Sequence, residues 1–321
     1  MRAKPRIFAS KCLGFANCRW DGATVNDRFV ERLGKHVDYV AFCPEMEIGL
    51  GCPRDPIRVV LINGQRTLFQ PNTGKEFSKE MLTYRSKQLS ALKKENLSGF
   101  ILKSRSPSCG IKDVKLFTGT KETSGHTGGS AGFFGEGVLE EYAPLAIEDE
   151  GRLTNFPIRE NFLTKAFTHA EFLAVKKTGT ARALSDFQAK NKYLLLAYNE
   201  KEMRLMGSLA ANLKKRAIKE IYEEYGEHLL LAFAKQLSFK PVINVLTHAL
   251  GYFKEQLVKE EKKFFLESME KYRAGKLPLS AVTGLLQMWI VKYKVDYLKD
   301  QTFFSPFPEE LVDLGDSGKG R

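Results

Sequence analysis

Three apolar segments in the first third of the chain each lead into a polar loop that carries a cysteine. The segments, which have the composition of buried β-strands, are residues 5–10, 37–42 and 99–103. The cysteines that follow them are Cys12, Cys43 and Cys109. Stretches with helical spacing lie between the strands, at 24–35 and 75–95. This alternation is typical of a parallel sheet with crossover helices, so we predict an α/β domain with a mostly parallel sheet for residues 1–150.

The carboxyl ends of parallel strands lie at one edge of a sheet, where open α/β folds bind their ligands. The three cysteines are therefore predicted to converge at this edge. Lys103 and Arg105 precede Cys109 in its loop, and positive charge of this kind favours a thiolate. The other two cysteines, Cys18 and Cys52, lie further into their loops, and we interpret them as non-ligands.

Two further features belong to this half of the chain. A hairpin is expected over residues 57–70, with Asn63-Gly64 as a type I′ turn. Residues 118–137 are expected to form a glycine-rich loop, in which His126 is interpreted as a solvated residue. The loop lacks the lysine spacing of a P-loop, so we expect no nucleotide cofactor.

The second half of the chain has a helical pattern. Apolar residues recur at three- and four-residue spacing in the predicted helices, which are 159–177, 181–198, 200–213, 215–237, 241–273 and 278–300. We therefore predict an all-α domain at 151–312, followed by a flexible tail at 313–321.

The chain is basic, with 50 Lys and Arg against 38 Asp and Glu and a net charge of +12. Most of the excess, +8, falls after residue 150. A basic excess suits a polyanionic partner, so the helical half is predicted to contact nucleic acid. No apolar run approaches the roughly 20 residues of a membrane span, and no signal sequence precedes the first strand. We expect a cytoplasmic protein.

The five cysteines all lie within the first 109 residues, and an odd number argues against a disulfide framework and for metal or redox chemistry. A structural zinc site would show close Cys-x2-Cys pairs, which this sequence lacks. An iron–sulfur cluster held by three thiolates leaves one iron open to act as a Lewis acid. The residue types alone leave three interpretations open: an iron–sulfur site, a redox thiol site and structural thiols.

The sequences around the cysteines resemble the thiouracil desulfidase family. The matching motifs are Ser10-Lys-Cys-Leu-Gly, Arg19-Trp-Asp-Gly22, Cys43-Pro-Glu and Leu102-Lys-Ser-Arg-Ser-Pro-Ser-Cys-Gly110. The helical half resembles a domain that accompanies this family in proteins similar to RNA thiouridine desulfidases. Its matching segments are Lys192-Tyr-Leu-Leu-Leu-Ala197, Asn244-Val-Leu-Thr-His-Ala-Leu-Gly-Tyr-Phe253, Tyr272-Arg-Ala-Gly-Lys-Leu-Pro278 and Pro306-Phe-Pro-Glu-Glu-Leu311.

The resemblance implies removal of sulfur from 4-thiouridine in tRNA, without net redox change, by an enzyme that depends on a 4Fe–4S cluster. The cluster ligands that it implies are Cys12, Cys43 and Cys109. The open iron is expected to bind the thiocarbonyl sulfur and polarise the carbon–sulfur bond. Glu45 is our candidate for the general base that activates water. Ser106 is expected to orient this base or pass a proton, with Ser108 as the second choice.

Candidates for RNA contact fall into two groups. The densest basic run of the helical half contains Lys214, Lys215, Arg216 and Lys219. The arginines near the cysteine loops, expected to meet the phosphate of an entering nucleotide, are Arg19, Arg54 and Arg105. Lysines at 254–263 alternate with glutamates, which is equally typical of a solvated helix face. A base inside folded tRNA must be unstacked to reach a buried site.

The sequence departs from the family pattern at Gln188 and Asn191, which stand where the family tends to have histidines. If those histidines contact RNA in the family, we expect this protein to bind RNA differently or more weakly. Three other functions remain open: a desulfidase of free thiouracil or another small thioamide, a cluster-dependent tRNA thiolation enzyme, and a non-catalytic RNA-binding module with a structural metal site. A thiolation enzyme usually shows a Ser-Gly-Gly-x-Asp-Ser loop, which this chain lacks.

Overall fold

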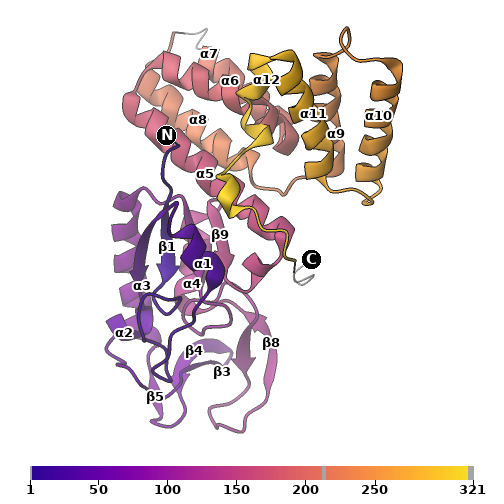
Figure 1. The fold of residues 1–321 in the computed structure, drawn as a ribbon. Helices are drawn as coiled ribbons and strands as arrows, with labels where there is room; N and C mark the ends of the chain where they lie inside the picture. The colour runs from indigo at the N-terminus through magenta and orange to yellow at the C-terminus, as the bar shows by residue number, and fades with distance from the viewer. Residues whose placement is uncertain (1, 212–214, 317–321) are drawn as a thin grey trace. The chain divides into compact units, whose positions relative to one another are not determined.

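The computed structural model describes residues 2–211 and 215–316 (Figure 1). The chain divides into two compact units, Met1–Glu171 with Glu310–Arg321, and Phe172–Glu309. The division lies within helix α5 (Phe156–Thr178), so it comes later in the sequence than the predicted boundary at residue 150.

The strands of the first unit form two sheets. Their bounds are β1 (Arg6–Ser10), β2 (Asp38–Phe42), β3 (Arg58–Ile62), β4 (Gln65–Gln70), β5 (Lys75–Glu76), β6 (Gly99–Leu102), β7 (Val114–Phe117), β8 (His126–Ser130) and β9 (Ala146–Asp149). The first sheet has the order β2-β1-β6-β9 and only parallel pairs, while the second has the order β5-β4-β3-β7-β8 and is mixed. The predicted α/β fold with a parallel sheet is confirmed.

The helices of this unit that precede α5 are α1 (Arg28–Leu33), α2 (Pro44–Glu47), α3 (Ser78–Leu92) and α4 (Phe133–Tyr142), with 3-10 turns at Lys93–Glu95 and Arg152–Thr154. Phe8 on β1 and Phe100 on β6 are fully buried, and the Phe8 ring lies 5.8 Å from that of Phe134 on α4. Met81 and Leu89 of α3 join the same apolar cluster. Truncating a phenylalanine in such a core costs about 3–5 kcal/mol, so this packing fixes the parallel sheet under α3 and α4.

The second sheet contains three hairpins, β3–β4, β4–β5 and β7–β8. Asn63 and Gly64 have φ values of 49° and 78°, as the predicted type I′ turn requires. The prediction of a loop over residues 118–137 is wrong in two parts, because His126–Ser130 form the strand β8 and α4 begins at Phe133. The glycine-rich β8 has no alternating apolar pattern, and its pairing with β7 makes it a strand. His126 is exposed, with its ring 5.8 Å from that of Phe117.

The second unit is helical throughout the residues described, which confirms the all-α prediction. Its helices are α6 (Ala181–Tyr198), α7 (Glu200–Ala211), α8 (Ile218–Ala232), α9 (Phe239–Gly251), α10 (Lys259–Arg273), α11 (Leu279–Tyr293) and α12 (Asp296–Lys299), with a 3-10 turn at Thr302–Phe304. A further 3-10 turn, Glu309–Leu311, lies where the chain passes from the second unit back to the first. Among the described residues, no helix has the length and apolar character that crossing a membrane requires.

Two predicted helices are each divided in the structure. The segment 241–273 forms two helices, α9 and α10. Phe253 and Leu257, in the turn between them, are buried and continue the apolar spacing of the helices, which is why the sequence predicts one continuous helix. The segment 278–300 is interrupted after α11 at Lys294, whose φ of 54° is left-handed and ends the helix.

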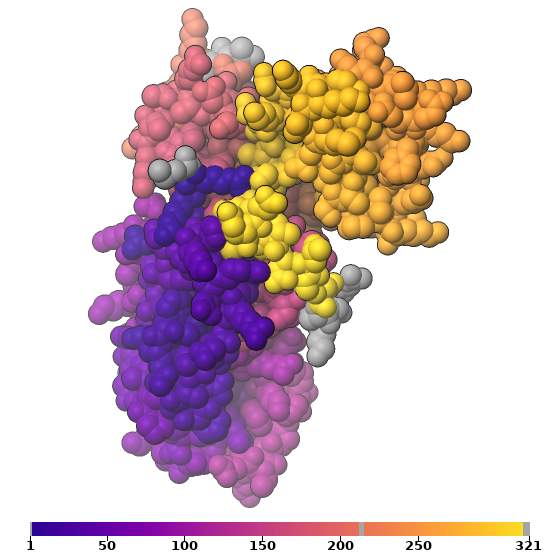
Figure 2. All heavy atoms as spheres, in the orientation of Figure 1, coloured from indigo at the N-terminus to yellow at the C-terminus, as the bar shows by residue number. Residues whose placement is uncertain are grey.

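The end of the described chain packs on the first unit, where Figure 2 shows it in yellow against indigo. Asp313 pairs with Arg32 at 3.0 Å, and the buried Arg159 donates hydrogen bonds to the carbonyl oxygens of Asp313 and Gly315. Because the Arg159 guanidinium needs these acceptors, residues 313–316 are not the free tail that was predicted. Residues 317–321 lie outside the described part of the chain.

Candidate active site

Three cysteines surround one cavity at the carboxyl edge of the parallel sheet. Cys12 lies two residues after β1, Cys43 directly follows β2, and Cys109 lies in the loop after β6. The strand β1 lies between β2 and β6, so the connections that leave β1 and β2 run to opposite sides of the sheet. Open α/β sheets bind ligands beside such a reversal of strand order. All three cysteines are at most 9% exposed and line a cavity of about 410 Å³. The predicted convergence of the three cysteines is confirmed.

Cys18 joins this group, which the sequence interpretation did not foresee. Cys12, Cys18 and Cys43 form one buried cluster, and Cys18 also lines the cavity. The Cys43 thiol lies 3.8 Å from the carbonyl oxygen of Cys18. Cys52 contacts the loop that carries Cys18, because its thiol lies 3.1 Å and 3.2 Å from the carbonyl oxygens of Asn17 and Arg19. The short separation of Cys12 and Cys18, within one loop, is the sequence feature that could have predicted that Cys18 lies at the cavity.

The surroundings of Cys18, Cys43 and Cys109 raise the pKa values of their thiols. The neighbouring Cys18 thiol and burial raise the pKa of Cys43, and burial raises the pKa of Cys109. A hydrogen bond with Cys12, with burial, raises the pKa of Cys18 to about 11. Lys103, which the sequence predicts to favour a Cys109 thiolate, forms an ion pair with Glu150.

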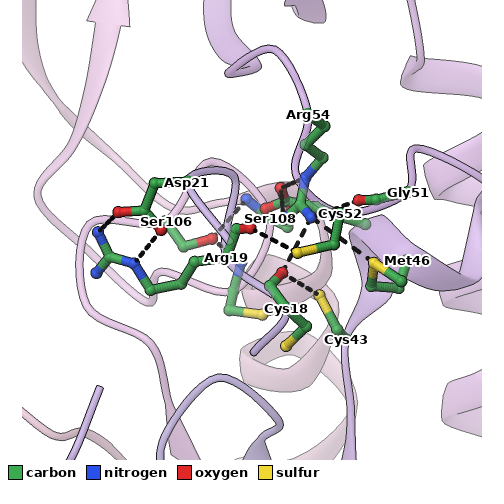
Figure 3. A network of polar contacts seen from close by, with 12 residues as sticks. Cys18, Arg19, Asp21, Cys43, Met46, Gly51, Cys52, Arg54, Ser106 and Ser108 are labelled. Atoms are coloured by element: carbon green, nitrogen blue, oxygen red, sulfur yellow. Dashed lines mark hydrogen bonds and ion pairs between the residues drawn. The ribbon is translucent and has the colours of Figure 1, made fainter. Parts of the chain in front are cut away.

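Glu45 presents a fixed carboxylate at the same cavity. Arg54 donates from Nε and Nη2 to Oε2 of Glu45 at 2.9 Å and 2.6 Å, and Ser108 Oγ donates to Oε1 at 2.7 Å. Arg54 and Ser108, both labelled in Figure 3, come from separate loops, between α2 and β3 and after β6. Each carboxylate oxygen has its own donor, so the orientation of the group is set before any ligand arrives.

Ser106 and Ser108 have different positions. Ser108 is fully buried and contacts Glu45, whereas Ser106 lines the cavity. Ser106 Oγ accepts hydrogen bonds from the backbone N–H groups of Ser108 and Cys109 at 3.2 Å and 3.1 Å. The prediction ranked Ser106 first as the residue that orients the base, and in the structure Ser108 is the serine in contact with Glu45.

The cysteine loop after β6 packs directly on the start of α4. The backbone N–H groups of Phe133 and Phe134 donate to the carbonyl oxygens of Pro107 and Ser108 at 3.0 Å and 2.9 Å. A Cβ on Gly132 would lie 2.6 Å from the Ser108 carbonyl oxygen, so only glycine allows this approach. Gly132, which belongs to the predicted glycine-rich loop, thus serves close packing beside the site.

The opposite wall of the cavity carries Lys103 and Ser104. Lys103 forms an ion pair with Glu150, and Ser104 donates to the same carboxylate from its backbone N–H and its Oγ at 2.7 Å and 2.6 Å. These bonds tie the loop after β6 to the residue that follows β9, so this wall of the cavity is also fixed.

The three arginines predicted to meet phosphate lie at this cavity in different settings. Arg54 is 5% exposed and bound to Glu45, so its prediction as a phosphate contact is wrong. Arg19 pairs with Asp21 at 2.9 Å. Arg105 is exposed and has no acidic partner among the described residues.

The basic run that precedes α8 is only partly open to RNA. Lys214 lies outside the described residues. Arg216 pairs with Glu220 and Glu224 at 3.8 Å and 2.6 Å. Lys215 and Lys219 are exposed and have no acidic partner in the described part of the chain.

Gln188 and Asn191 belong to the core of the second unit, with 9% and 1% exposure. Tyr225 donates from its hydroxyl to Oε1 of Gln188 at 2.6 Å, and Asn191 donates from Nδ2 to the Phe187 carbonyl oxygen at 2.9 Å. Both side chains are buried and bonded within the protein, so in this structure they do not present a surface for RNA.

The donor set is compatible with an iron–sulfur cluster. Among the residues that the structure describes, no three histidine, cysteine or carboxylate side chains are close enough to hold a single metal ion. A cluster makes a different demand, because each thiolate binds its own iron. Cys12, Cys43 and Cys109 are free thiols distributed around one cavity, which fits that demand.

Comparisons with known proteins give matches to both halves of the chain. A family described as 2-thiouracil desulfurase matches residues 7–150, and a family described as a protein of unknown function, DUF1722, matches residues 192–308. A solved structure of a 4Fe–4S-dependent thiouracil desulfidase, TudS, is 24% identical and covers 47% of this chain and 93% of that chain, with a TM-score of 0.38.

Two curated relatives have no described activity. The uncharacterised protein YbgA of Escherichia coli is 25% identical over 161 residues, which is 50% of this chain and 95% of YbgA. The uncharacterised protein YbbK of Bacillus subtilis is 30% identical over 125 residues, which is 36% of this chain and 82% of YbbK. By the family match over residues 7–150 and the likeness to YbbK, the chain belongs to the 2-thiouracil desulfurase family through its N-terminal α/β domain, and residues 192–308 after it are similar to DUF1722.

Proposed function

We propose that the protein removes sulfur from 4-thiouridine in tRNA, with a 4Fe–4S cluster as cofactor and water as co-substrate. The thiocarbonyl carbon exchanges its sulfur for the oxygen of water, which gives uridine and hydrosulfide without a change in oxidation state. Family membership supports an enzyme that acts on the carbon–sulfur bond of a thiouracil-like base.

One observation carries this proposal: the Glu45 carboxylate, fixed by Ser108 at 2.7 Å, faces a cavity lined by three strand-end cysteines. Cys12, Cys43 and Cys109 are the residues that would hold the cluster. When bound through three thiolates, a cluster supplies an iron that polarises a thiocarbonyl as a Lewis acid.

The side chains of the cavity perform the acid–base work. Glu45 Oε2 accepts two hydrogen bonds from Arg54, whereas Oε1 accepts one, from Ser108. Oε1 therefore keeps a lone pair that can accept a proton from water. Ser108 acts through Glu45 by holding its orientation. Ser106 accepts two backbone hydrogen bonds and donates its hydroxyl proton to no described residue, so this proton is available to a ligand in the cavity.

The choice of tRNA over a free base rests on the second unit. A free thiouracil does not need a basic helical domain, and Lys215 and Lys219 offer exposed charge without acidic partners in the described residues. Lysines in this setting suit the phosphate backbone of RNA. A domain that binds the body of the tRNA also offsets the cost of unstacking the thiolated base.

The test uses full-length protein, purified and reconstituted without oxygen, with thiolated tRNA, free 4-thiouridine and 2-thiouracil as separate substrates. Loss of the thiocarbonyl absorption and release of sulfide are followed together, with Cys109→Ala as the control. Sulfide from tRNA alone, and only when Cys109 is present, supports the proposal. Equal or faster turnover of the free base contradicts the tRNA assignment, and no turnover by cluster-loaded protein contradicts the reaction.

A further inference from the structure

Trp20 lines the candidate active-site cavity, and the proposed chemistry does not use it. Its side chain is 49% exposed, so the indole gives up much of the apolar burial that a tryptophan normally gains. Exposed aromatic rings at a binding cavity provide faces on which nucleobases stack. The position and exposure of Trp20 therefore indicate a role in ligand contact.

The loop that carries Trp20 is firmly held. The Arg54 backbone N–H donates to the Trp20 carbonyl oxygen at 2.9 Å, and Arg54 Nη1 donates to the Cys18 carbonyl oxygen at 2.9 Å. Asp21 pairs with Arg19 and accepts from the Ala23 N–H at 3.1 Å, which closes the turn. Since Arg54 also binds Glu45, the Trp20 backbone and the candidate base are anchored on one residue.

Arg105 lines the same cavity and has an unusual backbone conformation. Its φ of 57° lies in the left-handed region, which costs a residue with a side chain more than it costs glycine. Three other basic residues at the cavity form ion pairs with acidic partners: Arg19 with Asp21, Arg54 with Glu45, and Lys103 with Glu150. Arg105 has no such partner among the described residues, so its guanidinium is available to an anion.

We propose that Trp20 and Arg105 form a nucleotide subsite, in which a pyrimidine base stacks on the indole and the adjoining phosphate pairs with the guanidinium. This inference rests on the proposed function and narrows its substrate to a base that carries ribose and phosphate. A planar guanidinium binds phosphate oxygens through two hydrogen bonds, which gives orientation as well as affinity.

The test measures binding of the product nucleotide, which needs no turnover. Uracil, uridine 5′-monophosphate and the trinucleotide UpUpU are titrated calorimetrically into cluster-loaded full-length protein. The chain has two tryptophans, and Trp289 is 3% exposed within the second unit. In Trp289→Phe, Trp20 is the single remaining tryptophan, so a change in its emission on nucleotide binding reports contact with its ring.

Three variants locate the contacts. Trp20→Ala is expected to weaken binding of the monophosphate roughly tenfold, while Trp20→Phe keeps most of it. Arg105→Ala is expected to weaken the monophosphate roughly tenfold and to leave uracil unchanged. Lys121→Ala, which removes an exposed charge in the loop between β7 and β8, serves as the control and is expected to change neither.

Two results would overturn the subsite: a monophosphate that binds no more tightly than uracil, or unchanged binding in both Trp20→Ala and Arg105→Ala. Tighter binding of the trinucleotide than of the monophosphate identifies RNA as the source of the nucleotide, and equal binding identifies a free nucleotide. Protein that binds the monophosphate through Trp20 but releases no sulfide from any thiolated substrate keeps the subsite and contradicts the proposed reaction.

Discussion

Arg54 and Glu45 form a buried ion pair in which two guanidinium N–H groups converge on one carboxylate oxygen, at 2.9 Å and 2.6 Å. The two side chains are 5% and 11% exposed. Arg54 Nη1 also donates to the carbonyl oxygens of Cys18 and Gly51, so one guanidinium connects the candidate base to two loops. The position of Glu45 relative to the cysteines thus depends on Arg54.

Arg54→Lys tests this dependence. Lysine keeps the charge but loses the planar fork, so Glu45 is no longer held by two donors from one residue. We expect kcat for desulfuration to fall about tenfold, with KM and iron content unchanged. Arg204→Lys is the matched control, because its ion pair with Glu200 on α7 is 73% and 49% exposed on its two sides and contributes little. Equal kcat in both variants would contradict the positioning role of Arg54.

Ser108→Ala tests the second donor to Glu45. The substitution leaves Oε1 of a buried carboxylate without its hydroxyl partner, and such a loss costs about 1–3 kcal/mol. We expect a lower midpoint of thermal unfolding and a kcat reduced about tenfold. Ser124→Ala, in the loop between β7 and β8, should alter neither quantity. A wild-type kcat in Ser108→Ala would show that Glu45 does not need this bond.

Lys215 and Lys219 test the proposed RNA contact of the second unit. Replacing both with alanine is expected to weaken tRNA binding and to lower the slope of log affinity against log salt by roughly one per lysine. Lys176→Ala is the control, because Lys176 already pairs with Glu223 at 2.6 Å. If the salt dependence of the double variant matches that of the wild type, these lysines do not contact phosphate.

Glu160 on α5 predicts a pH dependence of stability. Burial raises the pKa of its carboxyl to about 7 from a usual 4.5, against the opposing charge of Arg159. Between these pH values the folded state keeps a proton that the unfolded state has lost, so the stability contributed by this group falls as pH rises through that range.

Glu160→Gln should therefore raise the free energy of unfolding at pH 8 by up to about 3 kcal/mol and leave it nearly unchanged at pH 4. Thermal unfolding of both proteins across this pH range measures the difference. Glu80→Gln, an exposed acid on α3, provides the baseline. A constant difference between Glu160→Gln and the wild type at all pH values would contradict the shifted pKa.

The sequence was informative where local pattern determines position. Cys12, Cys43 and Cys109 were found because strand periodicity and parallel topology together place strand ends at one edge. Arg54 was assigned to RNA because a sequence shows its charge and not its partner. Its ion pair with Glu45 arises from the folding of the loop between α2 and β3.

The same limit applies to the serines of the cysteine loop. Ser106 and Ser108 are two residues apart, and only the three-dimensional path of the loop decides which one contacts Glu45. Likewise, the residues of β8 have no alternating apolar pattern that would predict a strand. They form one because they pair with β7, and the sequence does not show this pairing.

The central claim is that Glu45 performs the chemistry at a site whose cysteines hold the cofactor. Iron content and sulfide release from thiolated tRNA, measured in the same preparations of wild type, Glu45→Gln and Cys109→Ala, test it most directly. We predict that Glu45→Gln keeps the wild-type iron content and loses sulfide release by about a hundredfold or more, while Cys109→Ala loses both. Sulfide release at the wild-type rate by iron-loaded Glu45→Gln would contradict the account.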